Sequence, residues 1–578
     1  MTTGSPSAGS RLEYVLPVML LVAAGLSGIF DRDLWTPDEP RVAAISLEMS
    51  RSLDPVIPHL AGEPFVEEPP LYYAVAAASR RLLGFVVGDT GAIRFTSVLW
   101  GIGALAAMFL LARRFFPRPQ AIAAVFMLAV MPGFVESAHW IRVDIALLFF
   151  VTAAMWCLSE ALMDGRRWFT VAAGLFAAGA FLVKGIIGPG VIAFGWLALL
   201  AARLPVLRKG GIVPLLLPHL LAAILFACLA GGWALLLRLN GGPELWHEWF
   251  WTNHVGRLLG TEPQLGHLRP GSPLYYLKTI AIYTLPWTPL IALWAFRLVR
   301  DLFVRKTVSA ANVFLLLWSA AILVVLSASV TKRNLYMLPI LPAFALMGAG
   351  ALGSAVPRWC RMFLSGWCIL CLAVLSACAY SPLLAFIPSV SRHLHQALCP
   401  DAVSFLFTWT SANAIAGAFI AASLFVLFRV QVSRLVCTAA VTAAAVAGLF
   451  AIAGKAVDIE KDLGRDIRAF ASATQGAPRG RIASWDFSET VRGSFYYYCD
   501  WSVPRLHDEG SLREVLAGRD PKYDSVVVSY EYGGPNLGGI PVETLAEMPA
   551  RPGGSTRRLV WMKGAGPGKA AKGSAGGG

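Results

Sequence analysis

Charged side chains are scarce in this sequence, and their scarcity excludes an ordinary soluble domain. Asp, Glu, Lys and Arg make up 15% of the 578 residues, whereas hydrophobic residues make up 56%. Soluble globular domains carry roughly 25% charged residues. The apolar residues lie in long runs, such as 15–29, and a helix that crosses a bilayer needs about 20 mostly apolar residues. The composition therefore predicts an α-helical polytopic membrane protein.

The apolar runs predict thirteen membrane-spanning helices. We place these at 13–30, 92–112, 119–135, 144–163, 168–188, 189–202, 213–237, 274–296, 308–330, 335–354, 361–380, 408–428 and 435–454. The boundary at 184–190 is the weakest, because it interrupts one long apolar stretch. No convincing small-residue cleavage site follows the first run, so we interpret that run as a retained anchor.

The sequence has fewer acidic than basic residues, 35 against 49, which gives a net charge of +14. The basic residues gather in short connections after even-numbered spans, for example at 113–118, 203–209 and 297–306. Short loops rich in Lys and Arg remain cytoplasmic. This alternation predicts a cytoplasmic N-terminus and an extracytoplasmic C-terminus. Topology thus accounts for the basicity, and nucleic acid is not required as a partner.

The outward segments differ from the basic ones in composition. Segments 31–94 and 239–272 contain aromatic and amphipathic patterns, which predict short helices at the outer membrane interface. Residues 1–455 thus form the membrane domain with these two loops. Strand-like and helix-like stretches alternate over 456–563 and predict a small α/β domain outside the membrane. The low-complexity tail, 564–578, is expected to be disordered.

Most of the nine cysteines lie in apolar spans and are expected to be packing residues. Cys399 and Cys499 fall in predicted outer segments, where a disulfide between them is an open alternative.

Carboxylates stand at the start of the predicted outer surface. The motif TPDEPR places Asp38 and Glu39 just beyond the first span, where adjacent carboxylates can bind a cation or accept a proton. A solvated acidic loop is the alternative. Asp144 lies at the outer edge of an apolar span, where an ionisable residue is a functional candidate, although a salt bridge with Arg142 would also explain it.

Cations on the outer side run against the positive-inside bias. Lys184 ends one span, and Lys332 and Arg333 precede Tyr336 in SVTKRNLYMLP. A bound phosphate would explain them, because Lys and Arg bind phosphate directly. Snorkelling of single side chains is the alternative. The whole set of outer carboxylates and cations suits a phosphorylated, membrane-embedded donor.

Two further motifs hold metal-ligand types. FVEEPPLYY contains Glu67 and Glu68, which an ordinary helix start would also explain. TNHVGR contains His254 and Arg257, and a histidine with one carboxylate can bind a metal, although a lone histidine is more often structural.

Six motifs occur in the order seen in one family. They are LWTPDEPRVAAISLEM, IPHLAGEPFVEEPPLYY, FLVKGIIGPG, FWTNHVGRLLG, GSPLYYLKTIAIYTLPW and SVTKRNLYMLPILP. The chain resembles bacterial aminoarabinose transferases (ArnT-like) and the related protein O-mannosyltransferases. The resemblance implies the GT-C membrane glycosyltransferase fold, with about thirteen helices and a C-terminal periplasmic α/β domain. It also implies the bacterial inner membrane as location.

The resemblance implies inverting transfer of a sugar from a polyprenyl-phosphate donor to a lipid or glycan acceptor. It makes Asp38 the leading catalytic carboxylate, supported by Glu39, with Asp144 as the second acidic position. It assigns Glu67 and His254 to a divalent metal, either zinc or magnesium or manganese. The carrier-phosphate residues are implied to be Lys184, Arg257, Lys332, Arg333 and Tyr336.

One position departs from the family pattern. Aminoarabinose transferases usually have Lys after the Glu of this motif, where this sequence has Glu68. The exchange leaves the donor sugar and the acceptor open. A lipid A-like glycolipid is the favoured acceptor, and protein Ser or Thr is the alternative.

A transporter would place its charges near the bilayer midplane, whereas the charged residues of this sequence gather at one face. A scaffold without activity is the third alternative.

Overall fold

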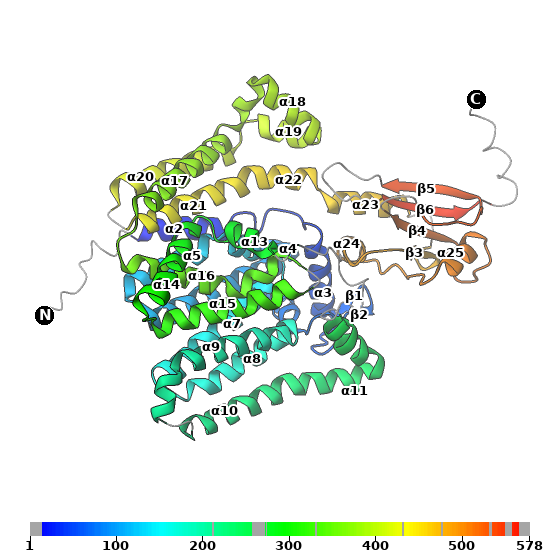
Figure 1. The fold of residues 1–578 in the computed structure, drawn as a ribbon. Coiled ribbons are helices and arrows are strands. Elements are labelled where there is room, and N and C mark those ends of the chain that lie inside the picture. The colour runs from blue at the N-terminus through cyan, green and yellow to red at the C-terminus, as the bar shows by residue number, and fades with distance from the viewer. Residues whose placement is uncertain are drawn as a thin grey trace.

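A bundle of long helices carries a small sheet domain at one end in the computed structural model (Figure 1). The structure describes residues 14–210, 213–256, 272, 274–329, 332–430, 433–474, 478–530, 534–548 and 558–565. This arrangement confirms the predicted fold class, an α-helical polytopic membrane protein with a small α/β domain.

The bundle alternates long helices with short helical turns. Its first half contains α2 (Val15–Leu26), α3 (Asp38–Ser52), α4 (Leu71–Phe115), α5 (Arg118–Val130), α6 (Pro132–His139), α7 (Asp144–Met163), α8 (Phe169–Lys184), α9 (Ile187–Gly210), α10 (Val213–Phe226), η1 (Ala227–Gly231), α11 (Gly232–His247) and η2 (Glu248–Gly256). Its second half contains α13 (Tyr275–Tyr283), α14 (Thr288–Arg300), η4 (Asp301–Arg305), α15 (Ala310–Ala328), η5 (Asn334–Ile340), α16 (Leu341–Gly350), η6 (Ala351–Gly353), α17 (Arg358–Ala379), η7 (Ser381–Phe386), α18 (Pro388–Ala397), α19 (Pro400–Phe407), α20 (Ser411–Arg429), α21 (Arg434–Leu449), η8 (Phe450–Gly454) and α22 (Lys455–Glu460).

The helices agree with the predicted spans. Within the described residues, nine helices are long and apolar enough to cross a membrane, or eleven if each of two bent pairs is one span. The bent pairs are α5 with α6 and α13 with the helix beginning at Thr288. The shorter apolar helices α2 and α8 coincide with the predicted first and fifth spans.

The first outer segment is more helical than the sequence predicted. Helix α3 is followed by a two-stranded antiparallel hairpin, β1 (His59–Leu60) with β2 (Glu63–Pro64). The predicted interfacial helix and the second span then form one helix, α4, which breaks at Gly88. Gly88 has φ +74°, a conformation that glycine adopts without the steric cost of a side chain.

The C-terminal domain contains α23 (Leu463–Ala473), η9 (Arg479–Arg481), β3 (Ile482–Trp485), α24 (Glu489–Cys499), α25 (Glu509–Leu516), β4 (Ser525–Tyr530), β5 (Val542–Met548) and β6 (Arg558–Gly564). Its sheet has the order β3-β4-β6-β5, in which β3 and β4 are parallel and the other pairs antiparallel. Alternate residues of β4 are buried on opposite faces: Val527 packs in one cluster with Phe495, and Val526 in another with Leu512.

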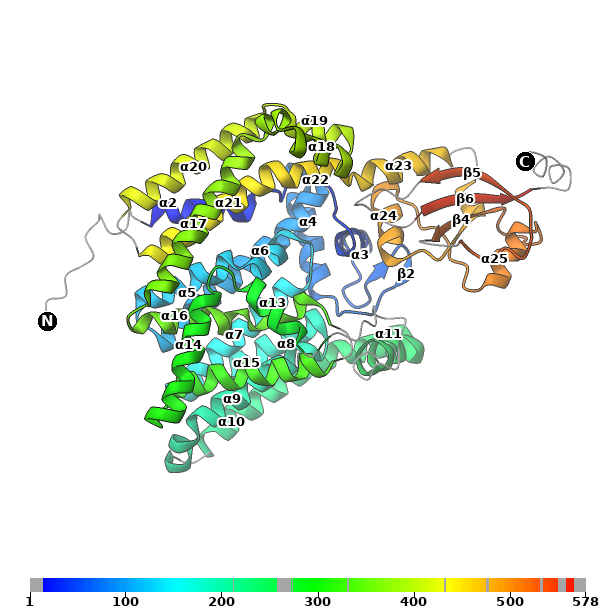
Figure 2. The same cartoon turned by 45° about the horizontal axis from the view of Figure 1, so that its top comes forward.

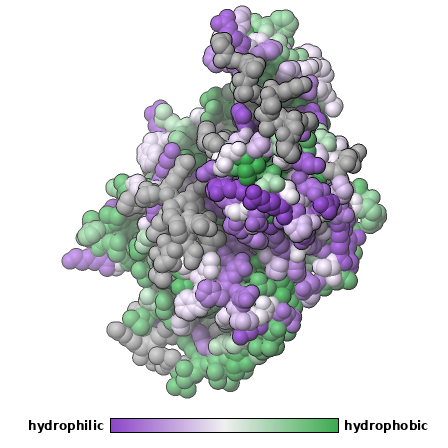
Figure 3. Space-filling model, turned by 90° about the vertical axis from the view of Figure 1, so that its right-hand side faces the viewer, coloured by the Kyte–Doolittle hydropathy of each residue, from purple (hydrophilic) through white to green (hydrophobic). Residues whose placement is uncertain are grey.

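This domain meets the bundle through α24, which lies beside α3 in both ribbon views (Figure 2). Seen from the sheet-domain end, hydrophilic residues gather in the middle of the face and apolar residues lie around its margins (Figure 3). Polar residues thus gather at the end of the molecule where the outer segments and the C-terminal domain meet.

Candidate active site

A pocket beside the start of α3 brings together residues from six separate segments. We call it the α3 pocket. It is lined by Asp38, Arg41, Val42, Glu67, Glu68, Arg142, Val143, Asp144, Lys184, Ile187, Asn253, His254, Arg333, Leu335 and Tyr336. Most of the site residues predicted from the sequence are in this set, although the segments that supply them lie up to about 300 residues apart.

Asp38, the first residue of α3, is paired with three guanidinium groups. Its Oδ2 accepts a hydrogen bond of 2.9 Å from Nε of Arg142 and lies 3.4 Å from Nη2 of Arg333. Its Oδ1 lies 3.7 Å from Nη2 of Arg41. Burial alone would raise the pKa of Asp38, but these cations and Lys184 outweigh it and lower that pKa. Asp38 is therefore a carboxylate at neutral pH.

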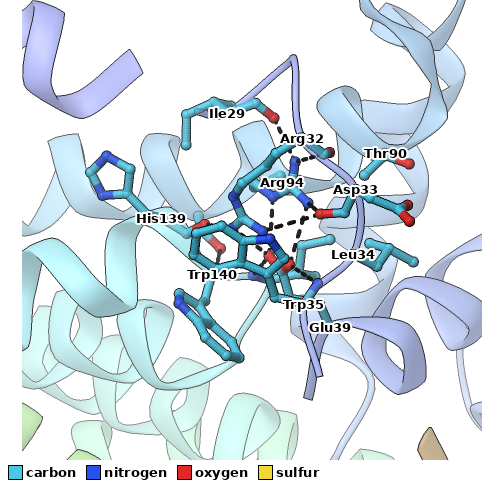
Figure 4. A network of polar contacts seen from close by, with 12 residues as sticks. Ile29, Arg32, Asp33, Leu34, Trp35, Glu39, Thr90, Arg94, His139 and Trp140 are labelled. Atoms are coloured by element: carbon cyan, nitrogen blue, oxygen red, sulfur yellow. Dashed lines mark hydrogen bonds and ion pairs between the residues drawn. The ribbon is translucent and has the colours of Figure 1, made fainter. Parts of the chain in front are cut away.

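Glu39 points the other way, into a buried network that lies outside the pocket (Figure 4). Its side chain is fully buried and forms ion pairs with Arg32 at 2.6 Å and with Arg94 at 3.0 Å. Backbone N–H groups of Trp35 and Ile141 also donate to it, at 2.7 and 3.0 Å. Burial opposes the charge of Glu39, but the two arginines lower its pKa to about 2.

This network joins the loop before α3, the helix α4 and the turn before α7. Arg94 also donates to the carbonyls of Ile29 and Asp33, at 2.8 and 2.9 Å, and Arg32 donates to the carbonyl of His139. Glu39, predicted as a catalytic residue beside Asp38, thus ties the start of α3 to α4 and to the turn before α7 and lies outside the α3 pocket.

Asp144 and Glu68 share the ammonium group of Lys184. Lys184 Nζ lies 2.5 Å from Asp144 Oδ1 and 3.7 Å from Glu68 Oε1. The hydroxyl of Tyr73 donates to Glu68 Oε2 at 3.1 Å. Burial raises the pKa of Glu68 to about 7. The ion pair that the sequence offered as an alternative for Asp144 is thus formed with Lys184, and not with Arg142.

Arg41 and Arg142 are the pocket cations that the sequence analysis did not select. Arg142 bridges Asp38 and Glu136, with 2.8 Å to the latter, and its guanidinium lies 4.0 Å from the Trp140 ring centroid. Arg41 lies 3.0 Å from Glu67. Both arginines stand within three or four residues of a selected carboxylate, and that proximity was the available signal.

The remaining predicted cations have different positions. Arg333 and Tyr336 line the pocket, but Lys332 does not. The Lys332 ammonium donates to the carbonyls of Ser327 and Ser329, at 2.7 and 2.8 Å, where α15 ends. A cation there satisfies carbonyls that the helix leaves without partners. Arg257 lies outside the described residues.

Glu67 and His254 both line the α3 pocket, and the metal predicted there stays a prediction. The carboxylate of Glu67 is paired with Arg41, and the Nδ1–H of the His254 ring donates to the Trp249 carbonyl at 2.7 Å. Within the described part of the chain, no group of three His, Cys, Asp or Glu side chains is placed to hold a metal ion. We therefore derive no chemical step through a metal. Cys399 and Cys499 are free thiols.

Comparison with known proteins gives a consistent relationship. Residues 67–233 match the family model of dolichyl-phosphate-mannose-protein mannosyltransferases. The chain is 30% identical over 386 residues to the undecaprenyl phosphate-alpha-4-amino-4-deoxy-L-arabinose arabinosyl transferase of Aeromonas salmonicida. This alignment covers 64% of the chain and 66% of the relative. A Pseudomonas aeruginosa protein of the same name is 29% identical over 344 residues, covering 57% and 58%. The aligned part thus spans less than two thirds of either relative.

The fold agrees over almost the full length. The crystal structure of ArnT from Cupriavidus metallidurans in the apo state matches with a TM-score of 0.70 at 20% identity, covering 96% of this chain and 98% of that one. The same protein bound to undecaprenyl phosphate matches with a TM-score of 0.69 at 20% identity, covering 97% and 99%. This match shows that the chain has the GT-C fold of ArnT, and its sequence is similar to the arabinosyl transferases over less than two thirds of their length.

Proposed function

We propose that this protein is an inverting glycosyltransferase, which moves a sugar from a polyprenyl-phosphate carrier to an acceptor hydroxyl on the periplasmic face of the inner membrane. The observation that carries the proposal is the α3 pocket, where the carboxylate Asp38 stands among the cations Arg41, Arg142, Lys184 and Arg333. The positive-inside distribution of Lys and Arg supports a cytoplasmic N-terminus and a periplasmic C-terminal domain.

The cations suit the leaving group of this reaction. When the bond between the anomeric carbon and the phosphate oxygen breaks, the negative charge on the departing polyprenyl phosphate increases. Preorganised cations that face this charge stabilise the transition state more than the bound substrate. In addition, Nε of Arg41 is buried without a hydrogen-bond partner among the described residues, and a phosphate oxygen would satisfy it.

Asp38 suits the role of general base. It accepts the proton of the acceptor hydroxyl as that oxygen attacks the anomeric carbon, opposite the phosphate, which inverts the configuration. The lowered pKa of Asp38 keeps it ionised but makes it a weak base. A donor phosphate in the pocket would share Arg142 and Arg333 with Asp38, and its negative charge would raise the basicity of Asp38 when both substrates are bound.

A lipid A-like glycolipid is the favoured acceptor, because the Aeromonas salmonicida and Pseudomonas aeruginosa relatives are named undecaprenyl phosphate-alpha-4-amino-4-deoxy-L-arabinose arabinosyl transferases. The family-model match to protein mannosyltransferases favours a second candidate, transfer to protein Ser or Thr. The donor sugar stays open, because Glu68 stands where the aminoarabinose transferases usually have Lys. Glu68 has a pKa of about 7, so above that pH it adds a negative charge near the donor phosphate.

Comparison of the membranes of a deletion strain and its parent tests the proposal. We expect the deletion strain to accumulate one polyprenyl-phosphate-linked sugar and to lack that sugar on lipid A. Complementation with Asp38→Asn should leave the accumulation unchanged, although the protein is present in the membrane. Loss of the sugar from envelope proteins instead would favour the second candidate. Identical polyprenyl-linked sugars in both strains would refute sugar transfer by this protein.

A further inference from the structure

One face of α24, in the C-terminal domain, packs on the first turn of α3. Glu489, Thr490 and Gly493 lie on this face, at positions i, i+1 and i+4 of the helix. The Thr490 hydroxyl donates to the Pro37 carbonyl at 2.8 Å. A Cβ on Gly493 would lie 2.7 Å from the Pro40 carbonyl oxygen, so only glycine permits this approach. The contact is therefore closest beside the residues that line the α3 pocket.

Glu489 completes the set of carboxylates around Arg41. One of its oxygens lies 2.6 Å from Nη1 of Arg41, which is closer than Glu67 at 3.0 Å or Asp38 at 3.7 Å. Arg41 thus leans toward Glu67 and Glu489, while its other nitrogen, Nη2, remains at a distance from Asp38 that exceeds a hydrogen bond. The Arg41 side chain is only 17% exposed, so its position depends on these anions.

We propose that Glu489 is a positioning residue for sugar transfer: from the C-terminal domain it holds Arg41 away from Asp38. This inference rests on the proposed function, in which Asp38 must accept a proton. Without the Glu489 charge, Arg41 is attracted by the remaining carboxylates, Glu67, Asp38 and Glu68, and shifts toward Asp38. Asp38 then has fewer lone pairs for the acceptor hydroxyl and becomes a weaker base.

A purely structural role of Glu489 is the alternative to a positioning role, and it would also favour an acidic residue at this position. Glu489 is the first residue of α24, where a negative charge interacts favourably with the helix dipole. In that case its loss would lower the stability of the C-terminal domain slightly and leave catalysis by the folded enzyme unchanged. The two roles are separated by kinetic constants rather than by stability.

The other end of the same helix pair supplies a matched control. Arg51, in the last turn of α3, pairs with Asp500, which follows α24, at 2.5 Å. This pair joins the same two helices, but it is exposed and neither residue lines the α3 pocket. Asp500→Asn therefore removes a carboxylate from the same interface without changing the surroundings of Arg41.

The test uses full-length protein in nanodiscs, with its polyprenyl-phosphate sugar donor purified from the deletion strain. We compare wild type, Glu489→Gln, Glu489→Asp and Asp500→Asn, each normalised to folded protein by size-exclusion chromatography. A misplacement of about 1 Å can reduce a rate about 100-fold. We expect Glu489→Gln to lower kcat roughly 10-fold to 100-fold and to raise the donor KM by less than that, because Arg142, Lys184 and Arg333 still face the phosphate. Glu489→Asp should restore part of kcat, and Asp500→Asn should equal wild type.

The outcomes separate this inference from the proposed function. Transfer by wild type with an unchanged kcat in Glu489→Gln refutes the positioning role and leaves the proposed function intact. An equal loss of kcat in Asp500→Asn also refutes it, because docking of the helices would then suffice as the cause. Absence of transfer by wild type, with the accumulated donor supplied, refutes the proposed function and this role with it. If Glu489→Gln does not fold, Glu489→Asp decides: a kcat equal to wild type with lower stability refutes the role.

Discussion

Glu39→Gln separates a positioning function of this carboxylate from a chemical one. The substitution keeps the size of the side chain but removes the charge that pairs with Arg32 and Arg94. The pKa of Glu39 falls from an ordinary 4.5 to about 2, and this difference corresponds to about 3 kcal/mol in favour of the ionised, folded state. Removing one partner of a buried ion pair costs about 3–5 kcal/mol in other proteins. We expect Glu39→Gln to lower the free energy of unfolding by about that amount.

The pH dependence gives this prediction a sign. Because the pKa of Glu39 is lower in the folded protein, its contribution is complete above the unfolded pKa of 4.5 and is lost as the pH falls toward 2. The difference in unfolding free energy between wild type and Glu39→Gln should therefore be largest at pH 6–7. It should shrink below about pH 5. Denaturant unfolding in detergent, followed by tryptophan fluorescence at several pH values, measures it.

Asp38→Asn is the matched control, because it removes one carboxylate from the adjacent residue of the same helix. Two of the arginines that pair with Asp38 still have a carboxylate partner in this variant. Arg142 remains paired with Glu136, and Arg41 remains paired with Glu67. We expect Asp38→Asn to unfold more like wild type and to lack turnover, whereas folded Glu39→Gln should retain turnover. A Glu39→Gln protein within about 1 kcal/mol of wild type, or a difference that stays constant down to pH 2, would refute the reasoning.

Three further predictions concern the α3 pocket. Asp38→Asn should lower kcat about 1,000-fold, the typical contribution of a general base, and a loss below tenfold would exclude that role. Arg333→Gln should raise the donor KM about tenfold, whereas Lys332→Gln should not change it, because the Lys332 ammonium binds carbonyls at the end of α15. Equal effects of the two substitutions on the donor KM would contradict the placement of Arg333 inside the pocket and of Lys332 outside it. Above pH 7, ionised Glu68 should repel the donor phosphate and raise the donor KM, and Glu68→Gln should remove this rise, as initial rates between pH 6 and 8.5 would show.

The membrane domain was predictable because its signal is local. Each span is a run of apolar residues in which every backbone group is satisfied by its own helix, so neighbours in sequence suffice to find it. The break in α4 was not predictable, because Gly88 is one glycine among many and a helix tolerates most of them. The sequence therefore indicated where the chain crosses the bilayer, but not that the outer helix and the second span are joined.

The pocket was partly predictable, because ionisable residues at the edge of apolar runs are costly without a function. Asp144 was selected on that ground, Asp38 as one of two adjacent carboxylates, and Lys184 and Arg333 as cations on the outer side. All four line the pocket. Glu39 was selected as the neighbour of Asp38, yet consecutive residues of a helix point about 100° apart. One carboxylate therefore faces the pocket and the next faces the interior, and only the packing around α3 decides which.

Glu489 lay beyond sequence reasoning, because it is 448 residues from Arg41 and nothing local marks the pair. Domains within a chain move relative to one another unless their interface is large or tightly fixed. Here the interface is fixed at several points besides Arg41. Tyr498 donates to Asp33, Arg492 pairs with Glu63 at 2.7 Å, and the hydroxyls of Thr90 and Tyr497 lie 2.8 Å apart. The start of α3, which carries Asp38, is thus held from both sides, by Glu39 in the bundle and by α24 outside it.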